Sequence, residues 1–455
     1  MMNLDMQKGS LWDKILWYAI PLALTGILQQ LFNAADIAVV GRFVGANAMA
    51  AVGSNTPLIN LLLNLFVGIS LGTNVVIANA IGRKDADTVR KAVHTSVIIS
   101  VSGGLAVTVV GELIAVPALR AMGVPAEVFD LALLYFRIYV AGVPIILLYN
   151  FTAAIYRSEG NTRMPLVVLL ISGIVNVILN LFFVAVLGRS VDGVAIATVL
   201  SNLISAVILI VGLVRSEGVT RIRPSDLKVD KKVLIRIVRI GIPSGVQGMT
   251  FSAANIVIQA SVNSLGAIVM AGSSAALNLE LFAFYILNAF GQACTTFVGQ
   301  NNGAGKKERC TRSLLLCFGE SALSTALICV LILYFGRPLL SFFNGDPEVI
   351  EAGYIRLIYI FGAYCFSFMV EVFSGYLRGY GISLFPAMVS LVGISGIRIV
   401  WIYTIFRKNH TFSSIMAAYP VSMLVTAVAL FCCIVLLRPW KGGRNGNDTE
   451  KARKN

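Results

Sequence analysis

Twelve stretches of mostly apolar residues, each of about 20 residues or more, recur along the 455-residue chain. A stretch of this length crosses the roughly 30 Å of hydrocarbon in a bilayer as an α-helix. A membrane β-barrel would instead show shorter segments in which apolar and polar residues alternate. With 57% hydrophobic and 13% charged residues, the chain also departs from the soluble average of about half and a quarter. The sequence therefore predicts an all-α membrane protein with twelve transmembrane helices, at about residues 14–40, 48–80, 92–117, 130–156, 165–187, 193–214, 233–262, 268–298, 313–336, 349–377, 385–405 and 413–437.

The basic residues indicate how these helices are oriented. A net charge of +14 could point to a nucleic-acid partner. However, the connections on one side of the twelve spans hold 27 of the 36 Lys and Arg residues, and those on the other side hold six. Because basic connections stay in the cytoplasm, we expect both termini and the 216–231 segment there. The positive charge is then explained by topology, and no nucleic-acid partner is expected.

The chain also carries an internal repeat. The pattern R-x-x-G-x4-P occurs twice, beginning at Arg157 and again 221 residues later at Arg378, and Ile20-Pro21 corresponds to Ile242-Pro243. An even number of spans per half gives both halves the same orientation, as in transporters built from parallel repeats. The alternative is a duplication that only enlarges a scaffold. The predicted parts are an N-terminal cytoplasmic segment (1–13), two six-helix lobes (14–215 and 232–437), a cytoplasmic inter-lobe loop (216–231) and a basic cytoplasmic tail (438–455).

Polar side chains inside the N-terminal spans form a candidate ion site. Asn33 and Asp36 share one face of the first span, Asn176 and Asn180 are four residues apart in the fifth, and Thr198 lies in the sixth. A carboxylate at mid-membrane costs roughly 2.5–3.5 kcal/mol on insertion scales, so Asp36 calls for a functional reason. Surrounded by amides, it can exchange a proton or bind Na⁺. The alternative is that the amides only hold helices together through hydrogen bonds.

The C-terminal spans carry a different polar set. Glu280, Glu371 and Arg398 are ionisable, while Asn255 and Gln259 lie on one face of the seventh span. We expect one of the two carboxylates to pair with Arg398 and the other to meet a cationic substrate or a proton. These five residues are the candidates for substrate binding.

Enzymatic constellations are scarce in this sequence. The chain has only two histidines and lacks the HExxH, GxSxG and GxxxxGK[ST] patterns. We therefore expect neither an enzyme nor an ATP-driven pump, and no cofactor beyond the coupling ion.

Four segments of the chain resemble a known family of transporters. They are Pro21 with Asn33-x-x-Asp36-x4-Gly41, Asn176-x3-Asn180 followed by Gly193-Val194-Ala195-Ile196-Ala197-Thr198, Gly299-Gln300-Asn301-x-Gly303-Ala304-Gly305-Lys306, and Leu377-Arg378-Gly379-x-Gly381. In this order, over about residues 14–437, they are similar to the multidrug and toxic-compound extrusion (MATE) transporters. The surroundings of Glu280 look like those of a bacterial drug-efflux or DNA-damage-associated subgroup.

The resemblance implies a V-shaped pair of six-helix bundles that open alternately to the two sides and export drug-like, often cationic compounds in exchange for H⁺ or Na⁺. Asp36 matches the family's coupling carboxylate, and Pro21 matches the proline at which the first helix bends. Asn176 and Thr198 match further coupling positions. Asn180 departs from the pattern, since many prokaryotic relatives have an aspartate there. With one acid fewer, a proton is favoured over Na⁺.

The expectation from the sequence is thus a cation-coupled exporter in a prokaryotic inner membrane. Its partners are a small organic substrate and the lipid bilayer, and it works as a monomer. Two rivals remain open: a flippase of the same superfamily for lipids or lipid-linked oligosaccharides, and a membrane-embedded enzyme acting on lipid substrates. The short loops disfavour the enzyme, and the lack of a cluster of basic residues within the spans disfavours the flippase.

Overall fold

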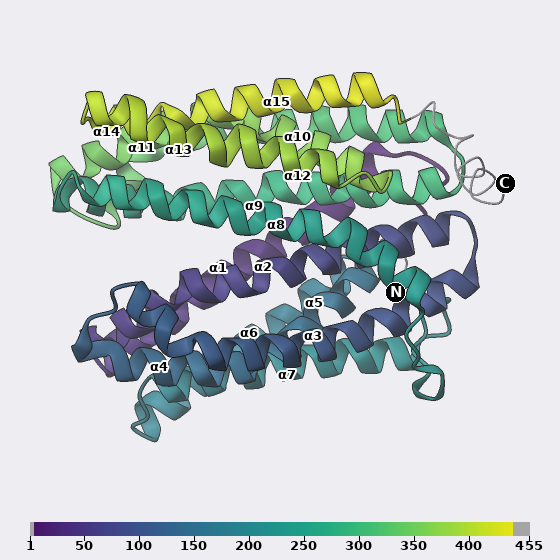
Figure 1. The fold of residues 1–455 in the computed structure, drawn as a ribbon, viewed down its shortest axis with the longest axis horizontal. Helices are drawn as coiled ribbons and strands as arrows, with labels where there is room; N and C mark the ends of the chain where they lie inside the picture. The colour runs from purple at the N-terminus through teal and green to yellow at the C-terminus, as the bar shows by residue number, and fades with distance from the viewer. Residues whose placement is uncertain (1–3, 440–455) are drawn as a thin grey trace. The chain divides into compact units, whose positions relative to one another are not determined.

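The structure is a computed structural model that describes residues 4–439. Parts of the predicted N-terminal segment (1–13) and of the basic tail (438–455) lie outside the described residues. The chain folds into helices joined by short connections (Figure 1). The first group is α1 (Trp12–Phe43), α2 (Ala46–Gly82), α3 (Ala86–Ala121), α4 (Ala126–Ala141), α5 (Val143–Ser158), α6 (Arg163–Leu181), the π-helical η1 (Phe182–Val186) and α7 (Val191–Arg215). The second group is the 3-10 turn η2 (Pro224–Asp226), α8 (Lys231–Asn263), α9 (Ala267–Gly303), α10 (Lys307–Ser341), α11 (Pro347–Gly379), α12 (Leu384–Ser390), the π-helical η3 (Leu391–Gly396), α13 (Ile397–Trp401), the π-helical η4 (Ile402–Phe406), α14 (Phe412–Met416) and α15 (Ala418–Leu437).

The helices have the lengths that a membrane requires. Within residues 4–439, ten are long and apolar enough to cross a bilayer. α4 and α5 add an eleventh span if counted together, because only Gly142 separates them and they bend by 48° there. α8 is 33 residues long, but two lysines and two arginines in its first turns make it more polar. Every predicted stretch coincides with one helix or a run of consecutive helices, and the predicted all-α multi-pass membrane fold is confirmed.

The described helices divide into two compact units. Unit 1 comprises residue 4 and Trp17–Asn255, and unit 2 comprises Asp5–Leu16 and 256–439. α8 therefore begins in unit 1 and ends in unit 2. This division follows packing, whereas the lobes expected from the sequence follow the repeat, so the lobe limits stay a prediction.

Glycines bring the first part of α8 onto unit 1. Gly68 and Gly72 of α2 face Gly241 and Gly245 of α8, and a Cβ on any of the four would come within 3.0 Å of main-chain atoms of the other helix. Only glycine permits this backbone-to-backbone approach. The apolar core beside it is formed mainly by α2, α3, α5 and α7, and a second core fills the space among α2, α4 and the start of α7.

Unit 2 is organised around α9 and α11. Gly375 of α11 lies against the backbone of Gly291 of α9, so that these two helices touch without side chains between them. The chain's beginning also packs here: Met6 is wholly buried, and its carbonyl accepts hydrogen bonds from Asn301 and Arg309, each at 3.2 Å. Asn301 belongs to the Gly299-Gln300-Asn301 segment, which thus has a structural role in holding the N-terminal segment.

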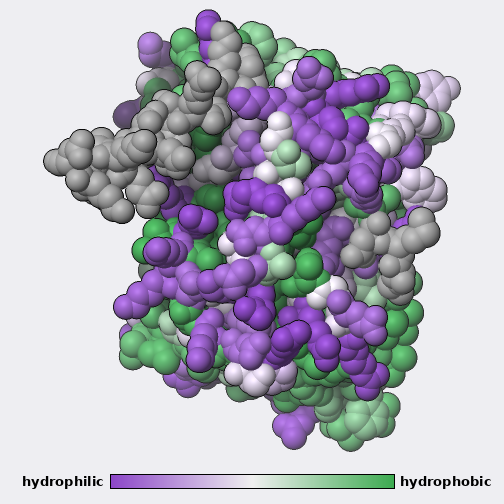
Figure 2. Space-filling model, turned by 90° about the vertical axis from the view of Figure 1, so that its right-hand side faces the viewer, coloured by the Kyte–Doolittle hydropathy of each residue, from purple (hydrophilic) through white to green (hydrophobic). Residues whose placement is uncertain are grey.

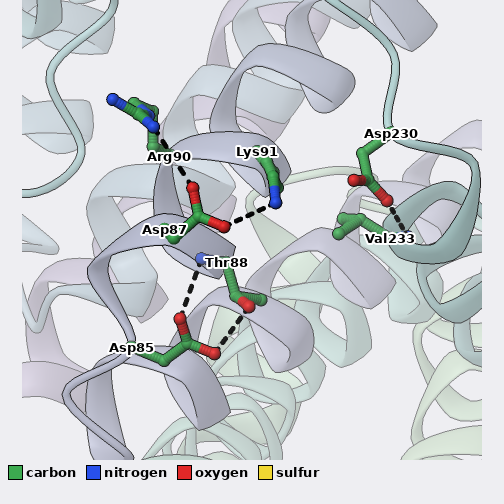
Figure 3. Close-up of polar contacts among 7 residues, drawn as sticks. All are labelled: Asp85, Asp87, Thr88, Arg90, Lys91, Asp230 and Val233. Atoms are coloured by element: carbon green, nitrogen blue, oxygen red, sulfur yellow. Dashed lines mark hydrogen bonds and ion pairs between the residues drawn. The ribbon is translucent and has the colours of Figure 1, made fainter.

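Hydrophilic side chains gather at one end of the helices (Figure 2). At the α2–α3 connection, Asp85 caps α3 by accepting hydrogen bonds from the Thr88 amide at 3.0 Å and hydroxyl at 2.6 Å (Figure 3). These two bonds lower the pKa of the Asp85 carboxyl. Asp87 pairs with Lys91 on the following turn, and Asp230 caps the start of α8. Such caps satisfy the N–H groups that a helix start leaves unpaired.

Candidate functional site

Asp36 is the centre of a buried polar site in unit 1. It lies in α1 and is only 5% exposed. Its Oδ1 accepts a hydrogen bond from the Asn180 side-chain nitrogen at 2.5 Å, and its Oδ2 accepts one from the Thr198 hydroxyl at 3.1 Å. The structure therefore brings Asp36 of α1 together with Asn180 of α6 and Thr198 of α7, which follow it by 144 and 162 positions in the sequence.

The geometry of α6 places the amides. Asn176 and Asn180 are one helical turn apart, both buried, and Asn180 also donates to the Asn176 Oδ1 at 3.2 Å. The π-helical η1 begins two residues after Asn180, and π-helical segments are frequent at functional sites. Gly173, one turn before Asn176, lies directly against the ring of Phe32, so α6 can approach α1 closely.

Two oxygen-bearing groups make the site suitable for a small cation: the Asp36 carboxylate and the Asn180 Oδ1. The Asn180 Oδ1 is buried without a hydrogen-bond partner among the described residues. An amide oxygen in this position, beside a carboxylate, can accept a hydrogen bond from a protonated group or coordinate Na⁺. Oxygen ligands of this kind suit hard cations, and no group of three or more His, Cys, Asp or Glu that could hold a metal occurs within residues 4–439. The site thus holds a single acid surrounded by neutral donors and acceptors.

Two tyrosines near Asp36 were missed by sequence reasoning. Tyr135 and Tyr139 of α4 interact electrostatically with Asp36. The centroids of the two tyrosine rings are 6.0 Å apart. Their i, i+4 spacing on one face of a span is the signal that could have identified them.

Two other residues predicted for this region lie outside the hydrogen-bonded group. Asn33 is exposed on α1, and the described hydrogen bonds to Asp36 come from α6 and α7 instead. Pro21 lies within α1, which continues unbroken from Trp12 to Phe43, and the Thr25 hydroxyl donates to its carbonyl at 2.8 Å. The bending role of Pro21 stays a prediction.

In unit 2, Glu280 has an ion-pair partner that the sequence did not suggest. Glu280 of α9 pairs with Arg356 of α11: the Arg356 nitrogens donate to its Oε2 at 2.7 and 3.2 Å. The expectation that one of Glu280 and Glu371 pairs with Arg398 stays a prediction. Sequence reasoning did not single out Arg356 as a candidate for the site. Because α9 and α11 meet at glycines, their side chains face one another at short range. This close approach explains the ion pair between α9 and α11.

Arg398 and Glu371 occupy separate surroundings. The Arg398 Nε donates to the Ser422 hydroxyl at 3.0 Å, and its guanidinium lies 4.1 Å from the ring centroid of Tyr419. Glu371 instead accepts a hydrogen bond from the Asn288 amide at 3.2 Å. Glu280, Arg398 and Glu371 thus each have different side-chain hydrogen-bond partners among the described contacts.

The seventh-span candidates join neither group. Asn255 is half-buried on the part of α8 that belongs to unit 1. Gln259 donates to the neighbouring Asn263 at 2.8 Å in an exposed position. Their role in substrate binding stays a prediction.

Glu320 of α10 is a further acid that sequence reasoning missed. Both of its carboxyl oxygens are buried without a hydrogen-bond partner among the described residues, and the charge of Asp13 acts on it. Glu320 is the one acidic residue in the predicted 313–336 span, which is the signal that could have identified it.

Together, the bundled apolar helices and the ionisable groups buried inside them define a multi-pass membrane protein of the transporter class. The family model described as MatE matches the chain twice, at residues 21–182 and 243–404. The chain therefore belongs to the MatE family. The two matches have the same length, and the second is displaced from the first by the same number of residues at its start and at its end. They therefore also support the internal repeat.

Relatives with curated names are similar over most of the chain. A probable multidrug resistance protein, YoeA, from Bacillus subtilis is 25% identical over 93% of both chains. A probable multidrug resistance protein, NorM, from Thermotoga maritima is 27% identical over 83% of this chain and 82% of its own. A protein named as an FAD transporter, from Shewanella oneidensis, is 23% identical over 78% and 80%.

Solved structures agree with the fold. A crystal structure of MATE in complex with MaL6 superposes with a TM-score of 0.90, covering 97% of this chain and 99% of its own, at 22% identity. Another match is a MOP superfamily transporter from Pyrococcus furiosus, with a TM-score of 0.89 at 22% identity. Similarity at this level of identity establishes the fold alone.

Proposed function

We propose that this protein is a secondary active efflux transporter that exchanges H⁺, or alternatively Na⁺, for drug-like organic compounds by alternating access. The observation that carries the proposal is the buried Asp36 carboxylate, held by Asn180 and Thr198 inside a helical bundle. The names of the multidrug relatives support the class of cargo. We place the protein as a monomer in a prokaryotic inner membrane, with both termini in the cytoplasm.

A proton is the favoured coupling ion, because the site offers one acidic side chain. Sodium sites gain affinity from several negative ligands, whereas a lone buried carboxyl needs only to gain and lose a proton. Asn180 fits either ion through its orphaned Oδ1. When Asp36 is neutral, its hydroxyl can donate to an amide oxygen, and when it is ionised, it accepts from the Asn180 and Thr198 donors.

The proposed alternation needs α1 to change shape. Pro21 removes one backbone hydrogen bond from the helix and is the natural hinge. Crystal structures of MATE in bent and straight conformations both match this chain, with TM-scores of 0.87 and 0.86. Movement about Pro21 would carry Asp36, four turns further along the helix, relative to its donors on α6 and α7.

Efflux from everted membrane vesicles tests the proposal. A pH gradient and a Na⁺ gradient are imposed separately on vesicles containing the wild type or Asp36→Asn, and export of a fluorescent cation is followed. Asp130→Asn, an exposed acid on α4, serves as the matched control. Each 100 mV of membrane potential supplies about 2.3 kcal/mol per charge.

We expect the wild type and the control to respond to the pH gradient. In Asp36→Asn, the gradient-driven transport rate should fall at least about tenfold, which corresponds to about 1.4 kcal/mol of activation free energy. A response to Na⁺ alone would assign sodium as the coupling ion. Undiminished gradient-driven transport by Asp36→Asn would refute the coupling role of this carboxylate. Movement of a labelled lipid in place of the dye would favour the flippase.

A further inference from the structure

The connection between α7 and α8, residues 216–230, packs against α3 in unit 1. The Arg223 amide donates a hydrogen bond to the His94 Nε2 at 3.2 Å. The Asp230 amide donates one to the Thr95 hydroxyl at 3.1 Å. Because these two bonds hold the connection along the side of α3, its side chains have a defined inner face and a defined outer face.

The inner face of this segment belongs to the apolar core of unit 1. Ile222 of the connection and Val233 and Ile237 of α8 are buried and pack within that core. Figure 3 shows the start of α8, at Asp230 and Val233, beside Lys91 of α3. The side chains that alternate with this inner row therefore point away from the protein.

The outer face combines large apolar side chains with basic ones. The apolar side chains are 51%, 38%, 42% and 63% exposed, for Val219, Leu227, Val229 and Ile235 in turn. The exposed basic residues among them are Arg221, Arg223, Lys228, Lys231, Lys232 and Arg236. We call residues 219–236 the basic-apolar surface. It has six basic and two acidic residues, so it carries four surplus positive charges.

The six basic side chains have no partner within the part of the protein that the structure describes. None of them makes a side-chain hydrogen bond or an ion pair there. Lys231 and Lys232 lie in the first turn of α8, which has no acidic residue. Positive charge is unfavourable at this place, because the N-terminus of a helix is itself positive. The stability of the fold therefore does not explain these charges.

The length of α3 indicates the depth of this surface in the membrane. The 36 residues of α3 span about 54 Å, whereas the hydrocarbon of a bilayer is about 30 Å thick. A centred α3 therefore extends about 12 Å beyond the hydrocarbon at each end. His94 and Thr95, which hold the connection, come eight and nine residues after the start of α3, or about 12–14 Å along it. The connection thus lies at the edge of the hydrocarbon, where the lipid headgroups begin.

From the charge, the exposed apolar side chains and this depth, we propose that the basic-apolar surface binds the anionic headgroups of phospholipids. The basic side chains contact the phosphates, while the four apolar side chains insert among the upper parts of the acyl chains. Topology accounts for basic residues on one side of a membrane, but it does not account for exposed apolar side chains among them. The proposal rests on the membrane fold, and on neither the coupling ion nor the cargo.

Tryptophan fluorescence of the full-length protein in vesicles tests this. Val229→Trp places a reporter on the surface, and the signal of the four native tryptophans is subtracted. The vesicles contain phosphatidylcholine and phosphatidylglycerol in equal amounts, and one lipid at a time carries bromine, a quencher of tryptophan, on its upper acyl chain. Both leaflets have the same composition, so the orientation of the protein does not matter. Acrylamide, which stays in the water, reports exposure to solvent.

Two double variants in the reporter protein separate the charge of this surface from charge elsewhere. Lys231→Gln with Lys232→Gln removes two charges from the surface, and it should not impair folding, because those charges oppose the α8 N-terminus. Arg407→Gln with Lys408→Gln is the matched control, since both residues are exposed in the connection between η4 and α14. If Val229→Trp does not fold, Leu227→Trp, another exposed position, replaces it as the reporter.

We expect brominated phosphatidylglycerol to quench the reporter more strongly than brominated phosphatidylcholine. The ratio of the two should fall at least about twofold in the Lys231 and Lys232 variant, because one basic residue near an anionic surface contributes up to about fivefold in affinity. It should stay at the starting value in the Arg407 and Lys408 control. Added salt should also lower the ratio, since it screens exposed charges.

Equal quenching by the two brominated lipids in the reporter protein would overturn the proposal. So would a reporter that acrylamide quenches and neither lipid does, because the surface would then face water and could serve only a soluble partner. An equal fall of the ratio in both double variants would refute it as well, since net charge, and not this surface, would then select the lipid.

Discussion

The close contact between Gly375 and Gly291 predicts that the substitution Gly375→Ala lowers the stability of the protein. A Cβ on Gly375 would collide with the Gly291 carbonyl oxygen and lie 3.0 Å from its carbonyl carbon and 3.1 Å from the Thr295 hydroxyl. The colliding atoms belong to the backbone and cannot rotate away. α9 and α11 would have to move apart along the surface that also carries the Glu280–Arg356 pair.

Two effects oppose one another in Gly375→Ala. Alanine is favoured over glycine within a helix by about 1 kcal/mol, while overpacking a tight interior costs about 1–3 kcal/mol. With an unyielding backbone contact, we take the upper end, and the net loss is about 2 kcal/mol. Gly362→Ala, on the same helix, is the matched control because nothing lies within 4 Å of its added methyl group. It should gain up to about 1 kcal/mol.

Thermal unfolding in detergent ranks the stability of the purified wild type and the two variants. We expect Gly362→Ala to unfold at or above the wild-type midpoint and Gly375→Ala clearly below it. Because such transitions can be irreversible, the ranking at one scan rate is the readout. A Gly375→Ala protein as stable as the wild type would show that α9 and α11 do not touch through their backbones. An equal loss in Gly362→Ala would also contradict the reasoning.

Two further predictions concern single charges. Arg356→Met should cost about 3 kcal/mol by leaving Glu280 without its partner, and Glu280→Met in addition should recover most of this loss, as unfolding of the single and double variants will show; additive losses would contradict it. Asp85→Ala should cost about 1 kcal/mol through loss of the α3 cap. Because the pKa of Asp85 lies below its ordinary value of 3.8 in the folded protein, its ionised carboxylate contributes stability above that value and loses it as the pH falls through the folded pKa. Unfolding against pH should therefore show a smaller acid dependence in Asp85→Asn, and an unchanged profile would refute this.

Much of the Asp36 site could be anticipated because each of its parts has a local signature. An acid in an apolar stretch needs a compensating partner, and amides at i, i+4 on a span share one face. These rules selected Asp36, Asn176, Asn180 and Thr198, which the structure brings together or places in adjacent turns. They also selected Asn33, which lies elsewhere. The face of a helix that turns towards its neighbours is not encoded in spacing alone.

The sequence by itself determined the helices and their duplication, because a bilayer leaves the backbone no partner outside the helix and a span must be apolar over its whole length. Only the tertiary structure decided which charges meet. The pairing of Glu280 with Arg356, the separate position of Glu371 and the burial of the Glu320 carboxyl oxygens depend on how each helix is rotated and how closely its neighbours approach. Those quantities are set by the glycines at the contacts between helices, where the absence of a few side-chain atoms fixes the distance and so selects the partner.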